Sequence, residues 1–191
     1  TDMKWCRFGN PGEESWGVLD TQGQVRDASS LALDLAAGLP ILDDEQLADL
    51  PLVPTGTRLG AAVPRPHKFL AVGLNYSDHA EEAGQPIPEL PVTFMKATSS
   101  ICGPHDDLIL PIGGEKVDWE VELAFVIGKP GRNISKDQAL EHVAGYLVCN
   151  DITDRGFQFD HGGQWSKGKA SDTFGPLGPV LVTPDLVPDP Q

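Results

Sequence analysis

Cysteine, basic residues and long apolar runs are all scarce in this sequence. Its three cysteines, Cys6, Cys102 and Cys149, are far apart and odd in number, so they indicate neither a zinc site nor a disulfide framework. Reduced thiols of this kind are typical of a cytoplasmic protein. No apolar run is long enough to cross a bilayer, and no basic segment followed by an apolar one marks a secretory signal. We therefore expect a cytoplasmic protein without a membrane-spanning segment.

Lysine and arginine number 14 against 28 aspartates and glutamates, which gives a formal charge of −14. This balance disfavours nucleic acids and anionic membranes as partners, because both are polyanions. The 191 residues are enough to bury a core as one domain with a small appendage. Seventeen prolines and 21 glycines indicate many turns and a β-rich architecture rather than a helical bundle.

A stiff, proline-containing connector at 63–66 divides the chain. Residues 1–63 are expected to form a small α/β appendage with a hairpin turn at 21–23 and a short helix at 43–50. Residues 64–191 are expected to form a second, larger domain. Its predicted strands are 68–72, 92–95, 108–110, 117–127, 146–151 and 180–182, and its predicted helices are 75–83 and 135–143. The Gly-rich stretch at 155–178 has little regular pattern, which is typical of a functional loop.

The predicted strand at 117–127 carries the most informative pattern, because side chains alternate between the two faces of a strand. One face is wholly apolar and is expected to face the core: Trp119, Val121, Leu123, Phe125 and Ile127. Glu120 and Glu122 share the other face, where two carboxylates so close together repel. Asp151 ends another apolar run, at 146–151. Three carboxylates on two strand ends suit Mg²⁺, Mn²⁺ or Ca²⁺ better than zinc. The alternative is a polar strand face that is simply solvated.

Two further sets of polar residues are candidates for chemistry. His79 and Glu82 lie three apart on the predicted helix at 75–83, so they share a face. A carboxylate beside an imidazole fixes its tautomer, which is a common arrangement of a general base; an exposed helix face is the plainer interpretation. Lys169, in the Gly-rich stretch, is a candidate for binding a substrate carboxylate or stabilising an enolate. Lys167 is a rival for that role, and a surface position is the plainer interpretation for both lysines.

Several motifs in one order resemble those of a known family. They are residues 68–76 with His79 and Glu82, residues 118–123, Asn150-Asp151 with Arg155 and Gln158, and residues 168–179. Together they resemble the fumarylacetoacetate hydrolase family, and the match runs from about residue 66 to the end of the sequence. Residues 7–12 are also similar to the small appendage of bacterial members. Leu74 stands where many acylpyruvate-cleaving members carry an arginine, so the resemblance does not imply recognition of a second substrate carboxylate by this position.

The resemblance implies an α+β, β-rich fold, a mixed β-sandwich roll with the small N-terminal α/β appendage, in a homodimer. Members continue into a further strand layer and a Thr-Gly-Thr-Pro loop, so we expect the C-terminal third of the fold to be missing and the sequence to be a fragment. The resemblance implies Mg²⁺ or Mn²⁺ held by Glu120, Glu122 and Asp151, with Ca²⁺ as a crystallisation substitute. It also implies catalytic and substrate-contacting residues: His79 and Glu82 as the water-activating pair, Lys169 as the third catalytic residue, and Asn75, Tyr76, Arg155 and Gln158 at the substrate.

The implied activity is hydrolysis of a C–C bond in a small-molecule 2,4-dioxo acid through a metal-stabilised enolate. Acylpyruvates and 2,4-dioxo-3-deoxy sugar acids are the substrate classes, and some appendage-bearing members carry a ureidoglycolate lyase label. Two alternatives stay open. An isomerase, decarboxylase or lyase acting on a 2-oxo acid needs the same metal but no attacking water. A catalytically silent metal-binding domain is the second alternative, motivated by the missing last part of the fold.

Overall fold

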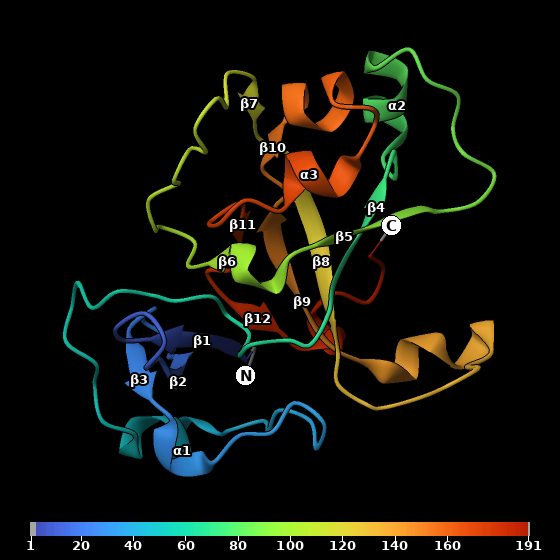
Figure 1. Cartoon of the computed structure of the whole chain (residues 1–191). Coiled ribbons are helices and arrows are strands. Elements are labelled where there is room, and N and C mark those ends of the chain that lie inside the picture. The colour runs from blue at the N-terminus through green and yellow to red at the C-terminus, as the bar shows by residue number, and fades with distance from the viewer. Residues whose placement is uncertain (1–2, 191) are drawn as a thin grey trace.

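A computed structural model describes residues 3–190 and is dominated by one six-stranded sheet (Figure 1). The strand order is β3-β2-β1-β12-β9-β8, and every neighbouring pair is antiparallel. The strands are β1 (Lys4–Phe8), β2 (Ser15–Leu19), β3 (Val25–Asp27), β8 (Val121–Ile127), β9 (Val143–Asn150) and β12 (Leu181–Val182). β12 therefore joins strands from the two predicted units into one sheet. The boundary at residue 63 stays a prediction.

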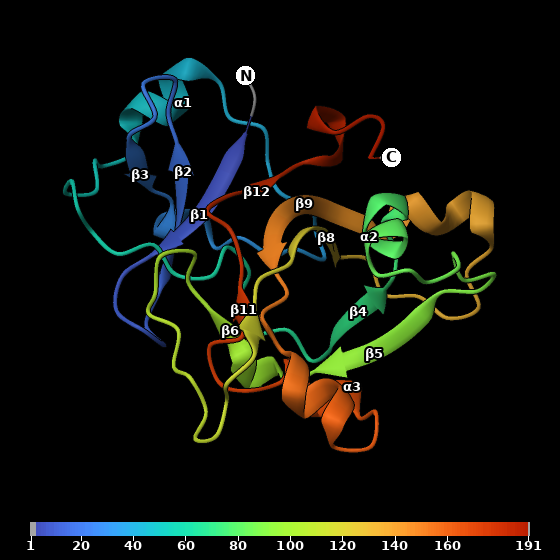
Figure 2. The same cartoon turned by 90° about the horizontal axis from the view of Figure 1, so that it is seen from above.

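Three two-stranded sheets complete the strands. β4 (Phe69–Gly73) pairs antiparallel with β5 (Val92–Lys96), and β7 (Val117–Asp118) pairs antiparallel with β10 (Thr153–Asp154). β6 (Ile101–Cys102) pairs parallel with β11 (Gly175–Pro176), so the strand content is mixed. Seen from above, the β4–β5 hairpin and the strands β1–β3 lie on opposite sides of β8 and β9 (Figure 2). The predicted strand-rich α+β class is confirmed.

Helices are few and short. The α-helices are α1 (Asp44–Asp49), α2 (Ser77–Glu82) and α3 (Trp165–Lys169), and a π-helical turn spans Gly156–Asp160. Single 3₁₀ turns span Ser29–Leu31, Thr98–Ser100 and Pro184–Leu186, and a longer 3₁₀ segment spans Lys136–His142. Asp43 and Gln46 form a reciprocal capping box that begins α1, as residues of these types at this spacing do. Within the described chain, no helix has the length and hydrophobicity that a membrane crossing needs.

The core lies between the N-terminal strands and the second half of the chain. Trp5 of β1, Val18 of β2 and Leu181 of β12 are fully buried, and Leu147 of β9 packs into the same cluster. Burial of large apolar side chains is the main stabilising term in such a cluster. Residues from both ends of the described chain contribute to this cluster. The N-terminal strands therefore stabilise the position of β9, which belongs to the same sheet.

Three secondary-structure predictions are wrong. The strand expected at 117–127 is two strands, because Trp119 and Glu120 leave the ladder between β7 and β8. Residues 108–110 form no strand, because their backbone pairs with no neighbouring strand and Ile109 N donates instead to the Thr173 hydroxyl. The helix expected at 135–143 is a 3₁₀ segment, Lys136–His142, and β9 begins directly after it at Val143.

The apolar face of β8 is exposed, which corrects the expectation that it faces the core. Phe125 is 59% exposed, and Val121, Leu123 and Ile127 are exposed as well. Trp119, which precedes the strand, is 68% exposed. The opposite face of the strand, through Ala124 and Val126, is the one that packs against the core cluster. The predicted alternation of side chains is present, but the face that packs against the core is the opposite one.

Candidate metal and substrate site

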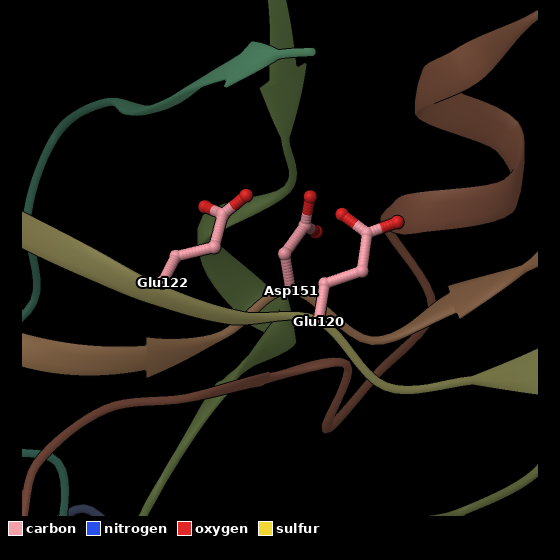
Figure 3. Close-up of side chains that lie close together, drawn as sticks. All are labelled: Glu120, Glu122 and Asp151. Atoms are coloured by element: carbon pink, nitrogen blue, oxygen red, sulfur yellow. The ribbon is translucent and has the colours of Figure 1, made fainter. Parts of the chain in front are cut away.

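The three predicted carboxylates meet where one strand ladder stops and the next begins. β8 pairs with β9 up to Val121 opposite Asn150, and β7 pairs with β10 beyond the gap. In the gap, Asp151 N donates to Glu120 O at 2.8 Å, and the Asn150 side chain accepts from Glu120 N at 3.1 Å. These bonds hold Glu120, Glu122 and Asp151 with their carboxylate oxygens within 4.8 Å of one another. Figure 3 shows the three side chains projecting toward the same side.

Lys169 reaches this cluster from the end of α3. Its ammonium lies 2.7 Å from Asp151 Oδ2, 3.1 Å from both oxygens of Glu120, and 2.8 Å from the Thr153 hydroxyl. Gly168 permits this approach, because a Cβ there would lie 2.6 Å from the Asp154 carbonyl oxygen. The structure therefore brings Lys169 to the carboxylates, whereas Lys167 is exposed and lies 5.9 Å from the centroid of the Phe157 ring.

Lys96 is a second buried lysine in the cluster, and sequence reasoning missed it. Its ammonium donates to Asp151 Oδ1 at 2.6 Å, to the Ile152 carbonyl at 3.2 Å, and to the Lys169 carbonyl. Burial lowers the pKa of this ammonium, and attraction to Asp151 opposes the shift. The available signal was alternation along β5, which places Lys96 on the same face as the half-buried Phe94.

Glu122 differs from the other two carboxylates because, among the described residues, it forms no ion pair with the nearby lysines or with Arg155. Glu120 pairs with Lys169 and with Arg155, whose Nη1 lies 2.6 Å away, and Asp151 pairs with both lysines. Within residues 3–190, no such ion pair reaches Glu122. Burial, followed by the charges of Asp151 and Glu120, raises the pKa of Glu122 to about 7. A proton or a bound cation would neutralise the negative charge of this side chain.

The first prediction follows from Glu122. Metal-free protein should lose stability as pH rises from about 4.5 to about 7. The folded state keeps the Glu122 proton to a higher pH than the unfolded chain, so it binds more protons in this window and rising pH favours unfolding. Glu122→Gln removes the dependence, because an amide does not titrate. Thermal melts in EDTA across and above this window test it, and indistinguishable pH dependences in parent and variant would contradict it.

The donor set fits a hard divalent cation. Three carboxylates provide only oxygen ligands, and no cysteine or histidine belongs to this group. Mg²⁺, Mn²⁺ and Ca²⁺ prefer such oxygens, whereas zinc sites in proteins are usually built from nitrogen and sulfur. The unbalanced Glu122 adds an electrostatic reason for a cation to bind here. Mg²⁺ and Mn²⁺ therefore remain the proposed metals.

His79 and Glu82, predicted as the water-activating pair, both lie on α2. His79 is half-buried and lines two cavities that also reach Glu120, whereas Glu82 is exposed and lines only the larger one. In the part of the chain that the structure describes, no hydrogen bond joins the two side chains. Tyr76, the residue before α2, connects this helix to β8 because its hydroxyl accepts a hydrogen bond from Leu123 N at 2.8 Å.

The predicted substrate contacts divide into two groups. Arg155 and Gln158 line the smaller cavity, and Gln158 is almost fully buried with its carbonyl oxygen 3.4 Å from Arg155. Arg155 also contacts Asp118 at 3.0 Å. Tyr76 lines the larger cavity, and its hydroxyl already accepts a hydrogen bond from the backbone of β8. Asn75 is exposed and lines neither of these cavities.

The fold and this carboxylate–lysine cluster define an enzyme-like α+β domain, and comparison with known proteins assigns its family. The model of the fumarylacetoacetate hydrolase C-terminal domain matches residues 68–191. A Burkholderia multivorans protein named "Putative hydrolase" is 53% identical over 195 residues, covering 99% of this chain and 69% of that protein. The chain belongs to the fumarylacetoacetate hydrolase family.

Solved structures agree with this assignment. A fumarylacetoacetate hydrolase from the psychrophile Exiguobacterium antarcticum superposes with a TM-score of 0.79 at 37% identity, covering 96% of this chain and 67% of that one. A 5-carboxymethyl-2-hydroxymuconate delta-isomerase from Mycobacterium smegmatis gives 0.71 at 33% identity, covering 95% and 66%. The chain thus spans about two thirds of the length of these relatives, and their names include both a hydrolase and an isomerase.

Proposed function

We propose that the protein is a divalent-metal-dependent hydrolase that cleaves a C–C bond of a 2,4-dioxo acid. The observation that carries the proposal is the convergence of Glu120, Glu122 and Asp151 beside Lys169, at a cavity that also reaches His79. The family assignment supports an enzyme, and the hydrolase name of relatives supports the reaction type.

Glu120, Glu122 and Asp151 would hold the metal. A divalent ion held there would supply Lewis-acid stabilisation of the negative charge that develops on a substrate oxygen. Lys169 is the protein's own cation at the same place, and its charge opposes the negative charge that develops on an enolate. Lys96 orients Asp151 by occupying one of its two oxygens, so that Oδ2 faces Lys169 and the cluster.

His79 is the proposed general base. It removes a proton from water, and the hydroxide attacks the 4-carbonyl carbon of the substrate. The C3–C4 bond then breaks, its electron pair forms the enolate of pyruvate, and proton return to C3 completes the products, a carboxylic acid and pyruvate. Glu82, one helical turn from His79, would orient the imidazole once α2 closes on substrate. This closure is part of the proposal.

Isomerisation of a 2-oxo acid is the second candidate, favoured by the isomerase title of a structural relative. It uses the same carboxylates and Lys169 to stabilise an enolate but needs no attacking water. The two candidates therefore differ in the need for His79 as a water-activating base. Decarboxylation and lyase chemistry differ from hydrolysis in the same way.

A homodimer in the cytoplasm completes the proposal. The exposed apolar side chains of β8 form a face that a second copy of the chain would cover, and exposed apolar patches commonly mark such interfaces. The three described cysteines are buried and unpaired, which suits a reducing compartment. Small-molecule acids, rather than nucleic acids or membranes, are the proposed binding partners.

The second prediction tests the reaction itself. Purified protein with Mg²⁺ or Mn²⁺ is expected to convert an acylpyruvate into a carboxylic acid and pyruvate, and EDTA should stop the conversion. Product analysis by NMR provides the measurement, and a 2-oxo acid that lacks the 4-oxo group is the matched control, which should stay intact. A product with the same mass as the substrate would favour the isomerase over the hydrolase. Metal binding without any turnover would contradict both reactions and favour a silent metal-binding domain.

A further inference from the structure

Two cavities of opposite character reach the carboxylate cluster. Both are lined by His79, Glu120 and Arg155. The larger, of about 1060 Å³, is rich in acids: Asp78, Glu81, Glu82, Asp118, Glu120 and Glu122. An anionic 2-oxo acid is repelled from that side by simple electrostatics. The smaller cavity, of about 450 Å³, contains Lys169 and has Glu120 as its one acid among the described lining residues.

Four apolar side chains line the smaller cavity: Leu74, Ala83, Phe159 and Trp165. Trp165 is fixed there by edge-on packing against Phe94 and Phe159, with ring centroids 5.5 and 6.3 Å apart. Its ring lies against the backbone of Gly73 so closely that a Cβ at this position would overlap it. Aromatic anchors held in this way make a preformed wall rather than a mobile surface.

The two cationic side chains of this cavity already form ion pairs with carboxylates of the protein. Arg155 contacts Glu120 and Asp118, and Lys169 contacts Glu120 and Asp151. Gln85, Gln158 and His79 are the other polar side chains among the described lining residues, and none of them carries a fixed positive charge. A second substrate carboxylate would therefore lie against the apolar wall without a cation, and a polyhydroxy chain would leave hydroxyl groups unpaired there. Both are costly when water is excluded.

We propose that the protein selects acids whose group beyond C4 is uncharged and apolar, a short alkyl or an aryl group, over dicarboxylic or polyhydroxylated acids. This substrate class rests on the proposed function, because it places the 2-oxo acid end at Lys169 and the carboxylates. The tail then lies between Leu74, Phe159 and Trp165. Each buried methylene should tighten binding about fourfold.

Calorimetric titration of 2-oxo acids in the presence of Mg²⁺ tests the tail separately from the reaction. Affinity should rise about fourfold per methylene from pyruvate to 2-oxohexanoate, and 2-oxoglutarate should bind at least about tenfold more weakly than 2-oxohexanoate. Leu74→Arg should remove the alkyl gain and improve binding of 2-oxoglutarate. Phe159→Ala, at a half-exposed position, should reduce the alkyl gain without adding charge. Ile112→Arg adds the same charge at a fully exposed site outside both cavities and should behave as the parent.

The outcomes separate the two proposals. A flat alkyl series, tighter binding of 2-oxoglutarate, or no measurable binding of any member would overturn the apolar-tail assignment. Faster cleavage of a dicarboxylic 2,4-dioxo acid than of its alkyl counterpart would overturn the assignment while leaving the hydrolase intact. A rising alkyl series in a protein that cleaves no 2,4-dioxo acid would support the tail pocket and refute the hydrolase.

Discussion

Glu120→Ala is expected to weaken Mn²⁺ binding by more than about 100-fold, beyond the range seen when only an outer partner of a ligand is lost. The variant removes one of three carboxylates and leaves Lys169 and Arg155 without one of their anionic partners. The uncompensated positive charges then repel the metal, so two effects act in the same direction. Calorimetry with Mn²⁺ on metal-stripped protein measures the change.

A second readout of the same variant is thermal stability. A ligand at 100 times its Kd stabilises the folded state by about 2.7 kcal/mol, so the parent should melt higher with Mg²⁺ than in EDTA. Glu120→Ala should lose that difference. Glu115→Ala, which removes the same charge from an exposed residue outside the carboxylate group, is the control and should keep it. Unchanged Mn²⁺ affinity in Glu120→Ala would rule out the site.

His79→Ala is expected to lower the rate of C–C hydrolysis by about 10²- to 10⁴-fold, the usual scale for loss of a general base. Metal affinity should barely change, because the imidazole belongs to the cavity wall and not to the carboxylate group. Steady-state kinetics and Mn²⁺ calorimetry on the same preparation separate the two quantities. An isomerase that needs no water would be affected much less.

Neighbouring variants sharpen this result. Glu82→Gln should lose less activity than His79→Ala, because it acts through the orientation of the imidazole and keeps its shape. Its loss should appear in kcat and in the pH profile of the reaction rather than in metal binding. Glu89→Gln, at an exposed residue outside both cavities, should retain the parental rate. Near-parental hydrolysis by His79→Ala would show that another group is the base.

The sequence predicted the carboxylate cluster because strand alternation is a local rule. Glu120 and Glu122 are two residues apart, so their shared side follows from the backbone alone, and Asp151 follows from the end of an apolar run. The same rule cannot say which face of β8 meets the core. That depends on which face of the sheet the rest of the chain packs against, which is a property of the whole fold.

Other features could not be predicted because they are set by contacts distant in sequence. Lys96 lies at the end of an ordinary strand, and only the approach of Asp151 and of the last turn of α3 makes it part of the site. The break between β7 and β8 depends on the side chain of Asn150 bonding to the backbone of Glu120. The apolar wall joins Leu74 to Trp165 across two separate segments.

The position of β12 determines when this protein can become a folded chain. β12 is the only described strand that connects β1 to β9, through Lys4 opposite Val182 and Val182 opposite Tyr146. On a ribosome the first strands therefore emerge long before their partner exists. Closing such a long loop is entropically costly and is slow in proteins dominated by non-local pairing. Until then the hairpin β1–β2 presents an unpaired edge, which is the kind of surface that chaperones protect from aggregation.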